Sequence, residues 1–260
     1  MPELPEVESY RRLAERALGR TVVEVGMPDG WFLKEGTTSE ALRSALVGHE
    51  LVAARRIGKL LLLDTDGGPV VGVRFGMTGT LVVDGVRGVD RLQHAPTRED
   101  PAWDRFALAF DDGGTLVVHD PRRLGGVVLD PVTTRLGPDA ASITTAGLTA
   151  ALAGSTAPLK ARLLDQARVA GIGNLVADDV LWRAGLSPQR PAGSLSAAEV
   201  RRLGRALGQT LDDALARGGS HLGDLTAERH HGGRCPRDGT ELVRDRVGGR
   251  TTWWCPAHQQ

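Results

Sequence analysis

The chain has 260 residues, of which 41% are hydrophobic and 25% are charged, and its formal net charge is zero. This composition is ordinary for a globular protein, and no apolar run reaches the roughly 20 residues that a transmembrane helix needs. Two cysteines cannot build a disulfide framework, and the acidic, proline-containing start does not resemble a signal peptide. We therefore expect a cytoplasmic protein without a membrane partner.

The charges are unevenly distributed along this neutral chain. Residues 229–260 contain six arginines and three acids, and a second basic group lies between Arg55 and Arg74. One basic face, and with it a nucleic-acid partner, is compatible with zero net charge. Only three lysines occur against 29 arginines, among them Lys59 and Lys160. A lysine can be retained where a compact ammonium is needed, but for any one of the three, chance retention is the favoured explanation.

The first half of the chain is predicted to be one helix followed by short strands. Val7, Tyr10, Leu13 and Leu18 recur at three- and four-residue intervals, which predicts a helix over 3–18. From 21 to 130, short apolar runs alternate with Gly and Asp, a spacing typical of an antiparallel sandwich or barrel. The expected strands are 60–63, 70–75, 80–83, 106–110 and 115–118.

The second half is predicted to be helical and to end in a small module. Helices are expected over 146–152, 160–169, 174–184 and 196–217. Ser196 and Glu199 have the spacing of a capping box, and Gly185 and Gly218 stand where helix C-caps belong. The fold class is therefore α+β. The expected parts are a sandwich domain over 1–130, a linker over 131–142, a helical domain over 143–228 and a two-cysteine hairpin over 229–260.

The amino terminus has the residues of a covalent catalyst. Met1 is normally removed when Pro follows it, and the exposed secondary amine of Pro2 can attack an aldehyde carbon to form an iminium. Glu3 and Glu6 would supply carboxylates for proton transfer beside it. Pro with acids in the first turn is also a common helix start, so these residues alone leave both interpretations open.

The two cysteines lie in a pattern that favours a metal site. Two residues separate Cys235 from Asp238, and two residues likewise separate Cys255 from His258. Two such pairs facing each other across a hairpin form a zinc ribbon, so we expect one structural Zn²⁺. Carboxylate is a less usual ligand in such sites. Asp238 is therefore the expected fourth ligand with His231 as the alternative, and two buried unpaired cysteines are the competing interpretation.

Three turns are candidates for contacts with DNA. A Gly-Ile-Gly-Asn sequence ends at Asn174, where the backbone can approach a phosphate and the side chain can cap a helix or bind the phosphate. A glycine-flanked turn presents Met77, which could enter a base stack or simply belong to the core. A third turn presents Arg122, which in isolation is equally compatible with a solvated surface.

Taken in order, the motifs resemble those of the formamidopyrimidine-DNA glycosylase and endonuclease VIII family. The resemblance spans essentially the whole chain, and the ordered set carries it rather than any single motif. It implies an N-terminal β-sandwich, a helix–two-turn–helix domain and a C-terminal zinc-finger hairpin, with damaged double-stranded DNA bound between them by a monomer. The motifs are Met1–Glu8, Ile57–Lys59, Gly76–Gly79, Asp120–Gly125, Leu136–Pro138, Leu163–Gln166, Gly171–Asn174, Gly249–Thr251, Cys255–Pro256 and Gln259.

The resemblance also implies a bifunctional DNA N-glycosylase and AP lyase of base-excision repair. Pro2 would attack C1′ of a flipped-out nucleotide and Glu3 would move the proton, with Glu6 supporting the site and Lys59 contacting phosphate. Strand cleavage by β-elimination, with or without a following δ-elimination, then proceeds from the same iminium. Asn174 would bind a phosphate beside the lesion. The full set of expected DNA contacts is Arg74, Met77, Arg122, Leu124, Lys160, Asn174 and Arg250.

The chain departs from this family at several positions. Leu124 replaces an aromatic residue of the first-named branch, and Arg74–Phe75 replaces an expected histidine. Gly219–Gly233 is too short for the family's lid over 8-oxoguanine, unless another loop such as 87–101 covers the base. We therefore expect 8-oxoguanine to be a poor substrate, with ring-opened purines, oxidised pyrimidines or bulkier lesions preferred.

Two other functions are compatible with parts of the sequence. One is a protein of the same fold that binds damaged DNA without cutting it, against which Pro2, Glu3 and Lys59 argue. The other is a small Arg-rich zinc-module protein that binds RNA or another protein, in which the acidic start is only a helix start.

Overall fold

The computed structural model describes residues 2–27, 29–89, 92 and 100–260. Contacts within the chain divide it into two units, Met1–Thr133 and Thr134–Gln260, each of which is described by itself. Met1 and most of the loop at 87–101, the alternative cover for a base, lie outside the described residues. Within the described ranges, no helix is long and apolar enough to cross a membrane.

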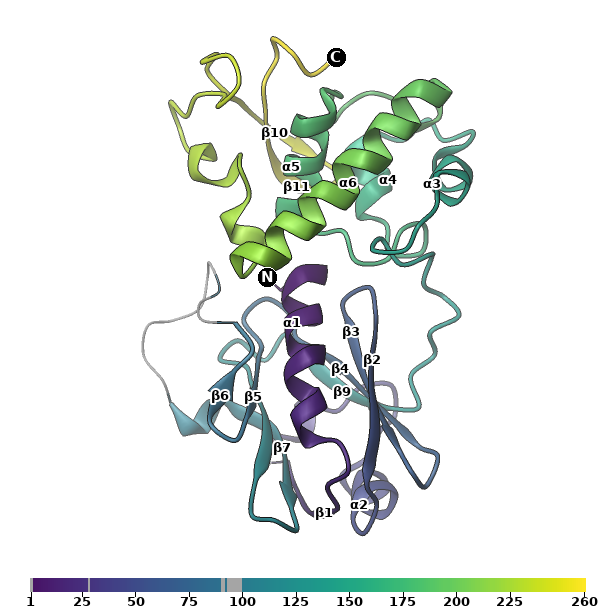
Figure 1. Cartoon of the computed structure of the whole chain (residues 1–260), viewed down its shortest axis with the longest axis vertical. Helices are drawn as coiled ribbons and strands as arrows, with labels where there is room; N and C mark the ends of the chain where they lie inside the picture. Colours follow the sequence, from purple (N-terminus) through teal and green to yellow (C-terminus); the bar gives the residue numbers. More distant parts are fainter. Residues whose placement is uncertain (1, 28, 90–91, 93–99) are drawn as a thin grey trace. The chain divides into compact units, whose positions relative to one another are not determined.

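The first unit contains two antiparallel sheets (Figure 1). The five-stranded sheet has the order β1 (Val22–Gly26), β7 (Asp104–Phe110), β8 (Thr115–His119), β5 (Thr80–Val83), β6 (Val86–Arg87). The four-stranded sheet has the order β2 (Leu51–Ile57), β3 (Leu60–Thr65), β4 (Val70–Arg74), β9 (Gly126–Leu129). The unit also contains α1 (Leu4–Ala14), η1 (Glu15–Ala17), η2 (Gly30–Phe32), α2 (Ser39–Leu46) and η3 (Pro101–Trp103).

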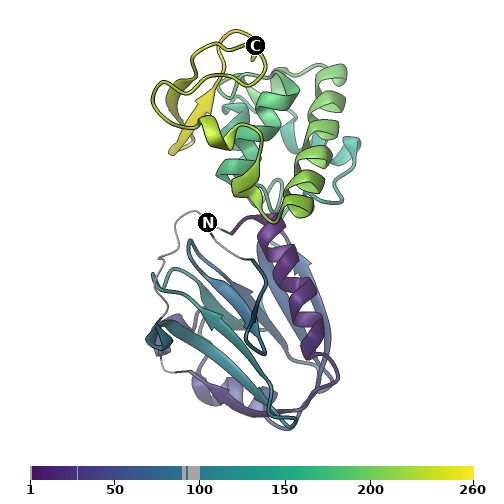
Figure 2. The same cartoon turned by 60° about the vertical axis from the view of Figure 1, so that its left-hand side comes forward.

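One apolar core lies between these sheets and α1. In β7 the side chains of Phe106, Leu108 and Phe110 alternate inward and are buried, as period-2 patterning requires. Helix α1 lies along the sandwich (Figure 2) and contacts β2 and β3 of one sheet and β5 of the other. Its Val7 and Tyr10 are fully buried. The predicted antiparallel sandwich is confirmed. The predicted first helix is shorter than expected, because its last turn tightens into η1.

The second unit is a helical bundle with a terminal hairpin (Figure 1). Its caps are those predicted: Ser196 and Glu199 form a capping box, while Gly185 and Gly218 end their helices at φ 63° and 99°. The elements are α3 (Thr145–Leu152), α4 (Leu159–Leu164), α5 (Asn174–Ala184), η4 (Ala192–Ser194), α6 (Ala197–Arg217), η5 (Ser220–Leu222), η6 (Thr226–Glu228), β10 (Val243–Val247) and β11 (Arg250–Trp254).

Helix α4 ends at Leu164 rather than at the predicted residue 169. Asp165 leaves the helix in an extended conformation, and its carboxylate accepts a hydrogen bond from the N–H of Ala167 at 3.0 Å. A short Asp side chain that bonds nearby backbone competes with helix continuation, which apolar spacing alone does not reveal.

Candidate active site and metal centre

The amino terminus is fixed by the first turn of α1. The helix begins at Leu4 with Glu3 as its N-cap, and Glu6 Oε2 accepts the N–H of Glu3 at 2.8 Å in a capping box. Pro2, Glu3 and Glu6 are all buried. The positive end of the α1 dipole is therefore next to Pro2, where it favours a neutral amine over an ammonium. Glu6 positions the backbone at Glu3 and through it Pro2.

The turn that presents Met77 is attached to the same helix. The hydroxyl of Tyr10 donates to the carbonyl of Gly79 at 3.2 Å, and its ring lies 4.4 Å from that of Phe75. Met77 itself is half-buried. Because Tyr10 is fully buried and hydrogen-bonded, the turn has a fixed place relative to Pro2, which precedes the same helix.

Buried Asp120 joins this turn to the one that carries Arg122 and Leu124. Its carboxylate accepts the hydroxyl of Thr78 at 2.8 Å and the N–H of Gly125 at 2.8 Å. The side chains of Arg122 and Leu124 remain exposed, Leu124 at 53%. Met77, Arg122 and Leu124 are thus brought together on two connected turns.

Only glycine fits at position 76 between these turns. Gly76 has φ 58°, and a Cβ there would lie 2.4 Å from the carbonyl carbon of Leu124. Both the backbone conformation and the contact exclude a side chain.

Lys59 lies in the turn between β2 and β3 and is half-buried. Arg56 at the end of β2 ties this turn to α1, since its Nε donates to Glu8 Oε2 at 3.1 Å and its Nη1 donates to the Gly58 carbonyl at 3.0 Å. Arg74 is exposed but forms an ion pair with Glu35 at 2.7 Å, so binding of phosphate by Arg74 would compete with that carboxylate.

In the second unit, the N-terminus of α5 lies beside the β10–β11 hairpin. Asn174 Nδ2 donates to the carbonyl of Thr251 at 3.1 Å, next to exposed Arg250. The buried Oδ1 of Asn174 has no hydrogen-bond partner among the described residues. A helix N-terminus and an amide are therefore close to the strand residue that precedes Thr251, the exposed Arg250, and these three groups are of the kinds that bind phosphate.

Lys160, expected to contact DNA, is a buried structural residue instead. Its side chain has no exposed surface, and Nζ lies 2.6 Å from Asp178 Oδ1. The ammonium also donates to Thr252 Oγ1 at 2.8 Å and to the Thr251 carbonyl at 3.1 Å. Arg229 forms a second ion pair with Asp178 at 2.8 Å. This group holds β11 against α5, so the prediction for Lys160 is corrected from direct contact to support of the hairpin.

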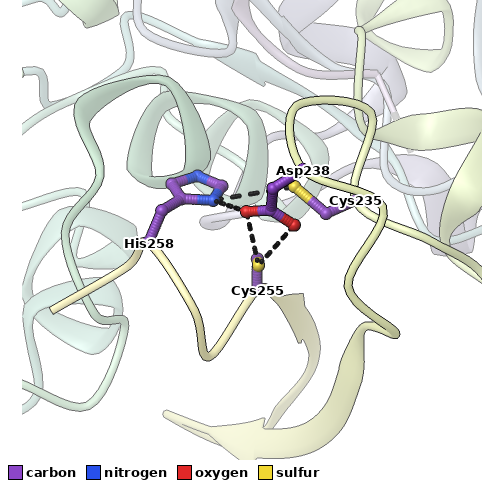
Figure 3. Close-up of side chains that lie close together, drawn as sticks. All are labelled: Cys235, Asp238, Cys255 and His258. Carbon is purple, nitrogen blue, oxygen red and sulfur yellow. Dashed lines mark hydrogen bonds and ion pairs between the residues drawn. The ribbon is translucent and has the colours of Figure 1, made fainter.

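The four predicted metal ligands come together at the end of the hairpin (Figure 3). Their ligand atoms lie within 4.8 Å of one another. His258 Nδ1 is 2.9 Å from Asp238 Oδ2 and 3.6 Å from Cys235 Sγ, and Cys255 Sγ is 3.4 Å from the same carboxylate oxygen. Two sulfurs, a nitrogen and an oxygen at these separations fit a tetrahedral ion after small adjustments.

Neighbouring groups hold these side chains in orientations suited to ligation. His258 Nε2 lies 3.2 Å from the Trp182 carbonyl, which leaves Nδ1 directed at the cluster. The Trp182 indole N–H donates to Cys235 Sγ at 3.2 Å. The backbone N–H of Thr240 and then His258 hold the pKa of Asp238 well below its usual range, so this carboxylate is ionised at neutral pH. His231, the alternative ligand, packs edge-on against Trp253.

Sequence patterns do not point to several of the supporting residues. The buried contact between Thr78 and Asp120 connects the turns that carry Met77 and Arg122, and Asp178 pairs with Lys160, which supports the hairpin; none of these three belongs to the predicted set. Asp120 begins the Asp-Pro-Arg-Arg turn, in which the arginines are the more obvious candidates. The only signal for Asp178 is an acid in a predominantly apolar helix.

A two-sheet sandwich that begins with Pro2-Glu3, followed by helices and a Cys/His hairpin, defines the helix–two-turn–helix class of DNA-repair proteins. Sequence profiles agree: the formamidopyrimidine-DNA glycosylase N-terminal domain matches residues 1–127, and the H2TH domain of the same enzymes matches 136–225. The chain belongs to the formamidopyrimidine-DNA glycosylase family, as its motifs predicted.

Individual relatives match over full length. The formamidopyrimidine-DNA glycosylase of Thermus thermophilus is 38% identical over 286 aligned residues, covering 100% of this chain and 98% of the relative. That of Paracoccus denitrificans is 35% identical and covers 100% of both. A mutant of the Lactococcus lactis protein, solved in complex with Fapy-dG-containing DNA, has a TM-score of 0.84 at 27% identity over 100% of both chains. The wild-type Lactococcus lactis protein in complex with DNA containing an oxidised pyrimidine has a TM-score of 0.83.

Proposed function

We propose that the chain excises damaged bases from duplex DNA, with the amine of Pro2 as nucleophile, and then cleaves the strand. The family assignment makes it a DNA glycosylase of base-excision repair, and its relatives have been solved bound to damaged DNA. The observation that carries the proposal is the placement of Pro2 beside the N-cap Glu3 at the positive end of α1.

The residues support each step of a balanced reaction. The Pro2 nitrogen attacks C1′ and gives up its proton, the bond from C1′ to the base breaks, and the base takes up a proton as it leaves. Glu3 shuttles a proton to the ring oxygen O4′, whose bond to C1′ then breaks. Opening of the sugar gives an iminium between C1′ and the Pro2 nitrogen. The iminium acidifies the C2′ proton, and removal of this proton expels the 3′ phosphate. Water then hydrolyses the iminium and frees the Pro2 amine. Glu6 does not touch the substrate in this scheme and positions Glu3.

Borohydride trapping on DNA with a pre-formed abasic site tests the nucleophile. Pro2→Gly, and a protein shown by mass to retain Met1, are expected to give no trapped adduct. Glu3→Gln is expected to retain more cleavage of the abasic site than base excision, because the base has already left. Full activity with Met1 in place would refute the role of Pro2. A wild-type protein that binds damaged DNA but traps no adduct would favour the non-catalytic alternative.

We further propose that the hairpin holds one Zn²⁺ through Cys235, Asp238, Cys255 and His258. When bound, the ion would supply a structural link between the two ligand turns, as expected for a module with so small a core. Metal analysis of untreated protein should find about one equivalent of zinc. Less than about half an equivalent would contradict the assignment.

The lesion preference is a third proposal, based on the segment Gly219–Gly233. This segment forms η5 and η6, and Asp224 within it pairs with Arg183 and Arg217, each at 2.6 Å. The N–H of Leu225 donates to Asp179 at 3.0 Å. A segment tied in this way to α5 and α6 is poorly suited to cover a base.

We therefore expect 8-oxoguanine to be excised more slowly than a ring-opened guanine or an oxidised thymine, because fewer groups would read its edge. Single-turnover excision of the three bases in the same duplex decides this. Fastest release of 8-oxoguanine opposite cytosine would show that the reasoning from this segment is wrong. The expected cytoplasmic location and monomeric state stay predictions.

A further inference from the structure

We infer that Trp31 and Lys34 form a second DNA-contacting element in the first unit, in which the indole packs on a base or sugar of the bound strand and the ammonium contacts phosphate. The inference rests on the DNA-binding function proposed above. It concerns residues that neither the motifs nor the reaction scheme includes.

Trp31 is an unusual surface residue. Its side chain is 68% exposed, the highest value among the large hydrophobic side chains of the described residues. Lys34 Nζ lies 4.5 Å from the centre of the indole ring and donates to the Trp31 carbonyl at 2.5 Å. A cation–π contact of this kind orients the ring while leaving its surface in solvent.

The segment that carries Trp31 forms one assembly with the turn that carries Leu124. Leu33 pairs with Val127, and the N–H of Lys34 donates to the Val127 carbonyl at 3.0 Å. The stem of Lys34 covers Gly126, where a Cβ would lie 2.5 Å from Lys34 Cγ. The segment 29–34, which carries Trp31, therefore packs directly against residues 126–127, which follow the proposed DNA-contacting turn; these two segments and the turn are called the platform below.

A salt bridge at the other end of the segment completes this platform. Asp29 pairs with Arg123 at 2.6 Å, although Arg123 occupies the left-handed region at φ 56°. The ion pair helps to stabilise that conformation, which an Arg side chain rarely adopts. The turn and the Trp31 segment are thus connected on both sides of Trp31.

The charge of the platform favours a polyanion as partner. Asp29 is shared by Arg123 and Arg105, at 2.6 and 3.6 Å. No described carboxylate forms an ion pair with Lys34 or Arg122. A single exposed indole among cations offers little apolar area to a protein partner. It matches single-stranded or distorted DNA, where bases stack on aromatic rings and cations follow the backbone.

The test uses full-length protein and a duplex with a tetrahydrofuran abasic-site analogue. Trp31→Ala is expected to raise Kd about tenfold, and Trp31→Phe by much less, because a smaller ring still stacks. Lys34→Ala should make the negative slope of log K against log salt shallower by about 0.9, because one phosphate contact is lost. Val23→Ala removes a similarly exposed side chain from β1, 51% exposed, and should leave Kd unchanged.

A second measurement reports on the ring directly. The fluorescence difference between wild type and Trp31→Phe isolates Trp31, and it should be quenched when the duplex is added. Unchanged Kd in Trp31→Ala overturns the inference, and so does a Trp31 signal that the duplex does not quench.

Borohydride trapping by the wild type separates failure of this inference from failure of the proposed function. If the wild type traps the adduct and Trp31→Ala binds normally, only the inference is wrong. If the wild type neither binds nor traps damaged DNA, the proposed function is wrong as well.

Discussion

Replacement of Lys160 by methionine should destabilise the second unit far more than the loss of a surface ion pair. Methionine has a similar length and no charge, so the substitution removes the ammonium with little change in packing. The lost contacts are those to Asp178, to Thr252 Oγ1 and to the Thr251 carbonyl. Asp178 would remain buried with one cation instead of two.

The magnitude follows from that geometry. Removal of one partner from a buried ion pair costs about 3–5 kcal/mol. Arg229 still pairs with Asp178 at 2.8 Å, and the N–H of Trp253 lies 3.4 Å from the carboxylate, so the lower end applies. About 3 kcal/mol in a unit of this size corresponds to a decrease in Tm of about 10 °C. DNA affinity should also fall, because Thr251 is the hydrogen-bond partner of Asn174.

Calorimetry and urea unfolding of Lys160→Met measure this change, and Arg55→Met is the matched control. Arg55 pairs with Asp64 at 2.6 Å but is 54% exposed, so its removal should cost less than about 1 kcal/mol. Equal destabilisation by the two substitutions would refute the assignment of Lys160 as the central residue of a buried network. A Lys160→Met protein as stable as the wild type would likewise contradict the buried network, whatever its DNA affinity.

Four further changes have defined outcomes. Arg190, together with the capping box, lowers the pKa of Glu199 from its usual 4.5 to about 2. The stability of the wild type relative to Glu199→Gln should therefore be greatest above about pH 5 and should be lost as the pH falls towards 2, which Tm measured against pH would show. Arg250→Ala should weaken binding to all duplexes and reduce the salt slope by about one, and an unchanged slope in a titration would contradict the phosphate contact. Cys255→Ser should lose bound zinc and lower Tm in a scan, whereas a normal metal content would exclude this ligand. Gly76→Ala should impair binding to abasic-site DNA by displacing the two connected turns, and wild-type Kd would show that the turns do not need each other.

The caps and spacings that are local in sequence were predicted correctly. The capping box at Ser196 and the left-handed glycines at Gly185 and Gly218 depend only on neighbouring residues, so their chemistry can be read directly. The alternation of short apolar runs predicted an antiparallel sandwich or barrel, and the resemblance to the family selected the sandwich. The bounds of the hairpin strands β10 and β11 could not be predicted in the same way, because their residues are largely polar and β11 packs against α5, a contact that no local pattern encodes.

The sequence by itself determined which chemistry is available to this protein: a Pro at position 2, acids beside it, and two spaced pairs of metal ligands. Each of these depends on residue type and short spacing. Tertiary structure alone decided which charged groups are accessible. Lys160 and Lys59 look alike in the sequence, but long-range contacts bury Lys160 against Asp178, 18 positions away, and leave Lys59 in a half-exposed turn. Desolvation depends on everything that surrounds a side chain, and only the folded chain specifies those surroundings.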